Sequence, residues 1–269
     1  MSDHSQRDEQ DHEVSTSTRT RYDPPTLPAP AIAWLTGSES IVLNYSAGVG
    51  SLCQGLLDLD HELYAVDSND DLLSHLRLAF PDVPTAIASP DAIPLPDNSV
   101  EVVVWAEPKA RKFWKALGEI TRVLRVDGKI AVAWSVPDTR IPWVRRLCSM
   151  VGITDPGSDL VACLAEFGAY GEPELNTFAH WTQLERDDVE RLARAQPAVS
   201  AADERAQSTV LAEVRQLYAE YERGIDGLRL PYVAHCLRAT LRPPEEEAVI
   251  PPGSAVEEDP GNTPLITFN

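Results

Sequence analysis

The 269-residue chain is predicted to form an α/β fold, a parallel sheet with helices on both faces. Strand-like and helix-like apolar periods alternate from about residue 41 to about residue 135. Apolar residues make up 43% of the chain, which is enough for a layered core. Because each parallel connection must cross back over the sheet, the alternation places helices on both of its faces.

The elements follow from these periods in chain order. Buried-strand patterns occupy residues 41–45, 62–67, 84–88, 100–105 and 129–135. Helical patterns occupy residues 51–59, 69–80 and 109–124, and residues 126–128 are typical of a turn. In the second half we expect helices at 141–151, 186–196 and 204–221, and strands at 177–182 and 231–239.

Both ends of the chain have the composition of flexible acidic tails. Residues 1–27 are polar with almost no large apolar side chains, and the stretch from Arg242 is rich in glutamate and proline. We therefore expect disordered tails at 1–27 and 242–269 around one folded domain at 28–241. The polar, acidic N-terminus lacks the apolar core of a secretory signal, and we expect a cytoplasmic protein.

The net charge and the cysteine spacing limit the kinds of molecule that we expect the protein to bind. A formal net charge of −19 argues against binding to nucleic acid or anionic membranes, which need a basic field. The chain has no apolar run of about 18 residues that could span a bilayer. Its four cysteines are far apart and do not have ligand spacing, so buried free thiols and no structural metal are expected.

The turn after the first strand indicates a ligand site. It contains Gly48 and Gly50, and glycine lets the backbone approach a ligand closely. Asp67 ends the second strand 19 residues after Gly48, where a carboxylate can accept hydrogen bonds from ribose hydroxyls. The glycine turn and Asp67 together predict a site for an adenosine-type cofactor. The competing interpretation is a tight structural turn beside a solvated aspartate. Cys53 stands where a dinucleotide motif needs its third glycine, so a cofactor without a pyrophosphate suits the spacing better.

These motifs resemble the class I S-adenosylmethionine-dependent methyltransferases, in particular the small-molecule "type 11" branch. The resemblance covers roughly residues 28–240. It is carried by the strand and turn at 42–50, the strand end at 65–67, the segments at 89–101 and 116–128, and Trp134, with further similarity at 142–147 and 230–233. The block from Asp91 to Gly128 is the most specific part.

The resemblance implies a Rossmann-like seven-stranded sheet whose last two strands form an antiparallel pair, with S-adenosylmethionine across the carboxyl ends of the strands. It implies an enzyme that methylates a small-molecule acceptor. The cofactor residues that it implies are Asn44, Ser46, Ala47, Gly48, Gly50, Asp67, Ser68, Asp91, Ala92 and Ala106.

The chain departs from the family pattern in two places. The usual turn is Asp-x-Gly-x-Gly-x-Gly, and here Asn44 replaces the acid and Ser46 the first glycine. If that position needs a positive φ, serine is strained there. The loop after the fourth strand lacks the histidine common in this branch, because no histidine lies between His75 and His180. We therefore assign no catalytic residue; alignment and desolvation can carry much of the rate for a carboxylate acceptor.

A local basic cluster follows the fourth strand. It predicts either a clamp for an anionic substrate or a solvated helix face with a Lys115–Glu119 pair; its members are Lys109, Arg111, Lys112 and Lys115. Several late aromatic residues could be core or pocket wall: Trp143, Phe178, Trp181 and Tyr232. The leading hypothesis is methyl transfer to a small, anionic molecule. The alternatives are a catalytically impaired, methyltransferase-like binding protein and, less favoured, a nucleotide-dependent oxidoreductase; the sequence leaves the oligomeric state open.

Overall fold

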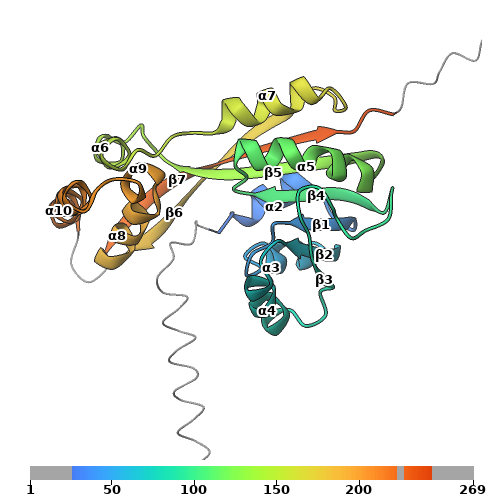
Figure 1. Cartoon of the computed structure of the whole chain (residues 1–269), viewed down its shortest axis with the longest axis horizontal. Helices are drawn as coiled ribbons and strands as arrows, with labels where there is room; N and C mark the ends of the chain where they lie inside the picture. Colours follow the sequence, from blue (N-terminus) through green and yellow to red (C-terminus); the bar gives the residue numbers. More distant parts are fainter. Residues whose placement is uncertain (1–25, 223–226, 244–269) are drawn as a thin grey trace, which may run out of the picture.

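The computed structural model describes residues 26–222 and 227–243, and its centre is a seven-stranded sheet (Figure 1). The strand order is β3-β2-β1-β4-β5-β7-β6. The strands are β1 (Ile41–Tyr45), β2 (Glu62–Asp67), β3 (Thr85–Ile87), β4 (Val100–Ala106), β5 (Leu124–Pro137), β6 (Glu174–Leu184) and β7 (Leu228–Thr240). The first five strands pair in parallel, and β7 pairs antiparallel with both β5 and β6. The predicted fold class and the antiparallel final pair are therefore confirmed.

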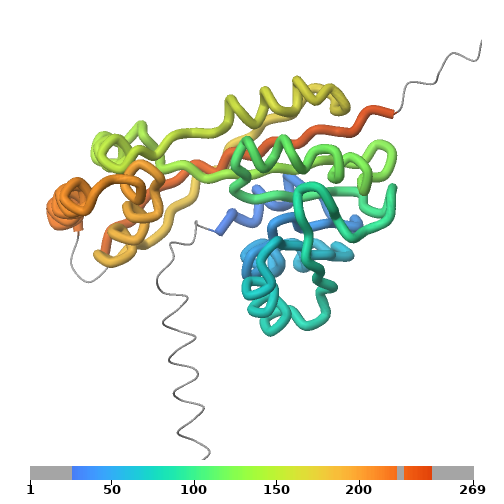
Figure 2. The backbone as a smooth tube through the Cα atoms, viewed as in Figure 1, coloured from blue at the N-terminus to red at the C-terminus, as the bar shows by residue number. Residues whose placement is uncertain are grey.

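Helices cover both faces of this sheet (Figure 1). One face carries α5 and α7, and the other carries α2, α3 and α4. The remaining helices form a separate lobe beside the ends of β6 and β7 (Figure 2). The helices are α2 (Ala29–Thr36), α3 (Cys53–Leu57), α4 (Asp70–Ala79), α5 (Ala110–Val123), α6 (Pro142–Val151), α7 (Gly157–Phe167), α8 (Arg186–Ala195), α9 (Pro197–Ser200) and α10 (Glu204–Tyr221).

Local sequence signals explain where the helices begin and end. The Asn69 side chain caps α4 by accepting hydrogen bonds from the amides of Asp71 and Leu72. Pro81 follows the end of this helix, since proline cannot continue it. Asp203 caps α10 in the same way by accepting from the amide of Ala206. In the part of the chain described here, no helix combines the length and the apolar character needed to cross a bilayer.

Three apolar clusters hold the layers together. One lies between the sheet and α5 and α7, and a second lies between the sheet and α2, α3 and α4. The third belongs to the lobe of α6, α8, α9 and α10 and to the adjoining ends of β6 and β7. All four cysteines are free thiols, and Cys53, Cys148 and Cys236 are buried, as expected for small apolar side chains.

The structure differs from the sequence prediction in one turn and in three helices. The predicted turn at 126–128 lies inside β5, where Asp127 has a φ of 62° and the pairing with β4 shifts register. Helices α2, α7 and α9 were not predicted. Trp143 and Tyr232 pack in or against the lobe core, Phe178 packs against the sheet core, and Trp181 is 53% exposed. The tails predicted at 1–27 and 242–269 lie largely outside the described residues.

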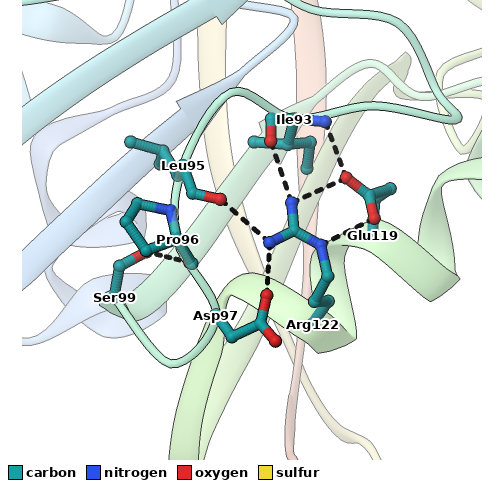
Figure 3. Close-up of polar contacts among 7 residues, drawn as sticks. All are labelled: Ile93, Leu95, Pro96, Asp97, Ser99, Glu119 and Arg122. Carbon is teal, nitrogen blue, oxygen red and sulfur yellow. Dashed lines mark hydrogen bonds and ion pairs between the residues drawn. The ribbon is translucent and has the colours of Figure 1, made fainter.

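Arg122 of α5 fixes the segment that follows β3 (Figure 3). Its guanidinium donates to the carbonyl oxygens of Ile93 and Leu95, to Asp97, and twice to Glu119. The Glu119 carboxylate also accepts from the Ile93 amide at 2.7 Å. Arg122 was expected only as part of a family-like block. Glu119 pairs with it, and the predicted Lys115–Glu119 pair is wrong.

Replacing Arg122 should destabilise the protein measurably. Arg122→Ala leaves two carbonyl groups and a partly buried carboxylate without their donor, and we expect a loss of about 2 kcal/mol in the free energy of unfolding. Arg125→Ala is the matched control, because it removes one ion pair to Glu101 in which both side chains are 43% exposed. For the control, urea denaturation should show a loss of about 0–1 kcal/mol in the free energy of unfolding. Equal losses in the two variants would contradict the role of Arg122 in fixing the segment after β3.

Glu119 should make the folded state sensitive to acid. The hydrogen bonds from Arg122 are the main cause that lowers the pKa of this carboxyl to about 2. The unfolded chain therefore binds this proton at a higher pH than the folded chain, so the stabilisation is complete above about pH 5 and is lost as the pH falls towards about 2. Urea denaturation between these limits should show a weaker pH dependence for Glu119→Gln than for the wild type. The exposed Glu166→Gln should keep the wild-type slope.

Candidate functional site

The turn that leaves β1 lies at the carboxyl edge of the sheet. Ser46, Gly48 and Gly50 all have a positive φ, of 58°, 58° and 91°. Ser46 is therefore in the left-handed region, where a side chain costs roughly 1–2 kcal/mol, and the strain predicted for a positive φ at this position applies. The Ala47 amide donates to the Val66 carbonyl at 2.9 Å, which ties the turn to β2.

Asp67 joins this turn to the one that follows β2. One carboxylate oxygen accepts from the Gly48 amide at 2.9 Å and the other accepts from the Asn69 amide at 2.9 Å. The residue is only 6% exposed. Each carboxylate oxygen has further acceptor capacity, so the group can hold the backbone and still accept from a ribose hydroxyl.

The neighbouring side chains of β1 point to opposite faces of the sheet. Asn44 is buried, and its amide nitrogen lies 3.8 Å from the sulfur of Cys53 in α3. Tyr45 packs against Trp105 on the other face, with ring centroids 4.5 Å apart. Burial is the main cause that raises the pKa of Tyr45 to about 12, followed by the charges of the nearby carboxylates. Its hydroxyl is therefore protonated at neutral pH.

A hollow of about 70 Å³ opens between these residues. Its lining residues are Tyr45, Ser46, Asp67, Ser68, Ala88, Pro90, Trp105 and Lys112. The chemistry suits an adenosyl group, because a carboxylate and aromatic rings face the same space. Its volume is below the roughly 300–1,000 Å³ of ligand pockets, so the residue types fit the cofactor and the present volume does not enclose it. Two of its lining residues, Ser68 and Lys112, are exposed.

The other expected cofactor residues do not line this hollow, and the Asn44 side chain points to the opposite face of the sheet, towards Cys53. Ala47, Gly48 and Gly50 form the turn, and Ala106 ends β4. Asp91 and Ala92 are exposed in a tight turn closed by two hydrogen bonds between Ser89 and Ala92. Of the ten residues expected from the sequence, Ser46, Asp67 and Ser68 line the hollow.

A larger cavity, of about 400 Å³, lies at the carboxyl ends of β4 and β5. The strand ends and the β4–α5 loop form one side, and the α6–α7 loop, α8 and β7 form the other. The lining residues are Glu107, Pro108, Lys109, Ala110, Trp134, Ser135, Val136, Pro137, Ile153, Thr154, Pro156, Asp159, Leu192, Gln196 and Tyr232. We call this cavity the acceptor chamber.

Trp134 is the fixed aromatic wall of the acceptor chamber. Its indole N–H donates to Asp155 at 2.7 Å, and its ring stacks on His235 with centroids 5.4 Å apart. A Cβ at Gly157 would lie 2.7 Å from the Trp134 ring, so only glycine permits this approach. These contacts hold a flat apolar surface in one orientation.

The structure divides the basic cluster between the two hollows. Lys109 lines the acceptor chamber and Lys112 lines the smaller hollow, whereas Arg111 and Lys115 are exposed and line neither of them. Sequence reasoning did not identify Glu107 as a site residue. It also did not foresee that His180 would lie beside the chamber, 3.3 Å from the hydroxyl of Ser135. The register of the strands brings Glu107, Ser135 and His180 together, and the local sequence pattern does not predict that register.

Comparisons with known proteins agree with this architecture. A family model described as a methyltransferase domain matches residues 43–132. An uncharacterized methyltransferase of Mycobacterium tuberculosis is 32% identical over 228 residues, covering 81% of this chain and 90% of the relative. A methyltransferase of Schizosaccharomyces pombe is 30% identical over 189 residues, covering 66% of this chain and 74% of the relative.

Solved structures show the same fold at lower sequence identity. A protein of Anaeromyxobacter dehalogenans assigned as a type II methyltransferase superposes with a TM-score of 0.60 at 20% identity, covering 82% of this chain and 98% of that one. The strand order, the turn at Gly48 with Asp67 opposite, and the 90% coverage of the mycobacterial relative lead to one conclusion. The chain belongs to the type 11 branch of the class I S-adenosylmethionine-dependent methyltransferases.

Proposed function

We propose that this protein transfers the methyl group of S-adenosylmethionine to a small molecule held in the acceptor chamber. The proposal rests on one observation: the segment 105–112 contributes lining residues to both hollows. Trp105 and Lys112 face the smaller one, while Glu107 and Lys109 face the larger one. A cofactor anchored at Asp67 would therefore present its reactive end to the acceptor chamber across the end of β4.

The chain's own residues supply binding and alignment. Asp67 would hold the ribose, the Ser46–Gly50 turn would lie along the methionine part, and Asp91 would face the adenine edge. S-adenosylmethionine supplies an electrophilic methyl carbon when bound, and the apolar part of the chamber wall would hold the acceptor in place for the transfer. An anionic acceptor would depend on Lys109, the only one of the four clustered cations that lines the chamber.

The second candidate is a binding protein that has lost catalysis. It is favoured by the 70 Å³ volume of the smaller hollow and by the left-handed serine in the turn. Calorimetry with S-adenosylmethionine separates the two functions. Micromolar binding supports the enzyme, and the absence of binding to a folded sample supports the binding protein.

Asp67 should dominate cofactor affinity. We expect Asp67→Asn to weaken S-adenosylmethionine binding at least about tenfold, because a charged acceptor of a hydrogen bond contributes about 1.5–3 kcal/mol. Calorimetry measures the affinity, and thermal melting checks that the turn held by Asp67 survives. Asp71→Asn, at an exposed position in the first turn of α4, should bind like the wild type. Equal affinity in both variants would remove Asp67 from the site.

Restoring the family turn should tighten binding. The double substitution Asn44→Asp with Ser46→Gly returns a negative charge beside the methionine ammonium and relieves the left-handed serine. We expect about a tenfold gain in affinity for S-adenosylmethionine by calorimetry, equivalent to about 1–2 kcal/mol. Ser46→Gly alone is the control for the backbone effect. Because position 44 is buried, melting curves should accompany each titration; an unchanged affinity in a folded double variant would contradict the prediction.

A further inference from the structure

The loop that leaves β4 holds Glu107 firmly against the end of β5. Its backbone is left-handed, with a φ of 54°, and its amide donates to the Ala133 carbonyl at 2.7 Å. Its carboxylate accepts from the Ser135 amide at 2.7 Å. A left-handed conformation at a non-glycine residue is kept only where the surroundings determine it, and such positions gather at functional sites. Both ends of Glu107 are thus fixed at the wall of the acceptor chamber.

The surroundings of Glu107 change its protonation. Glu107 is an exposed residue, but the protein packed around its carboxylate desolvates this group and raises its pKa to about 7, with the hydrogen bond from Ser135 opposing the shift. Two other charged groups face the same chamber, Lys109 at the start of α5 and Asp159 of α7. A carboxyl that ionises near neutral pH can accept a proton there and release it again.

We propose that Glu107 is the catalytic base, receiving the proton of a weakly acidic hydroxyl or thiol on an apolar acceptor in the acceptor chamber. This rests on the proposed methyltransferase function and deepens it. The apolar walls, with the fixed Trp134 ring and Tyr232, suit a flat apolar body, and the carboxylates of Glu107 and Asp159 disfavour a carboxylate acceptor beside them.

The proposed step forms one bond, breaks one bond and transfers one proton. The acceptor oxygen or sulfur uses a lone pair to form its bond to the methyl carbon, and the carbon–sulfur bond of the donor breaks with its electron pair going to sulfur. The proton of the acceptor passes to a carboxylate oxygen of Glu107. The neutral carboxyl then returns this proton to water after the product leaves.

The test compares the full-length wild type with Glu107→Gln and with Glu166→Gln, a control at an exposed position of α7. The probes are 1-naphthol and 1-naphthoate with methyl-labelled S-adenosylmethionine. For 1-naphthol, wild-type kcat/KM should rise with pH and level off above about pH 7, since the base must be ionised. Glu107→Gln should lower it about hundredfold and abolish this pH dependence, while any transfer to 1-naphthoate changes less than threefold. Glu166→Gln should match the wild type.

A second measurement needs neither cofactor nor acceptor. In protein labelled with carboxyl-¹³C glutamate, the NMR signal missing from Glu107→Gln should titrate near pH 7 in the wild type; titration near 4.5 overturns the proposal whichever probes react. A Glu107→Gln variant that binds S-adenosylmethionine and methylates 1-naphthol within threefold of the wild type also overturns it. A wild type that binds no S-adenosylmethionine overturns the proposed function, and the role of Glu107 with it.

Discussion

The carboxylate of Asp67 is the constraint on which the cofactor end of the site depends. It accepts hydrogen bonds from the amides of Gly48 and Asn69, and so it fixes the turns after β1 and β2 relative to one another. These hydrogen bonds stabilise a turn in which Ser46, Gly48 and Gly50 all have a positive φ. Because those strands are parallel neighbours, their turns emerge at the same edge of the sheet. One buried charge therefore organises the backbone that a ligand would meet.

A second set of contacts organises the opposite side of this edge. The Arg122–Glu119 pair holds the segment after Asp91, and Trp134 is held by Asp155 and His235. The central strands thus carry a hollow of about 70 Å³ on one flank and the acceptor chamber of about 400 Å³ on the other. Glu107 lies in the loop between them, at the wall of the acceptor chamber.

Local periodicity predicted the elements that bury one regular face. The strands β1 and β2 and the helix α10 match their predicted ranges, because alternating or helical apolar patterns determine such elements directly. The turn expected at 126–128 lies instead within β5, as an irregularity between the pairs Val100–Leu124 and Val102–Lys129 where Asp127 is left-handed. Asp67 was recognisable from its spacing to Gly48, whereas the chamber was not. Its walls come from five separate parts of the chain and exist only after the lobe packs on β7.

The position of β7 has a consequence for biosynthesis. It is the last strand of the sheet to leave the ribosome, and it fills the gap between β5 and β6. Until it arrives, β5 has an open edge and β6 has no partner strand in the sheet, so both can pair with foreign chains. The nascent molecule must therefore be shielded, or must mature quickly, during the interval between synthesis of β6 and insertion of its final neighbour.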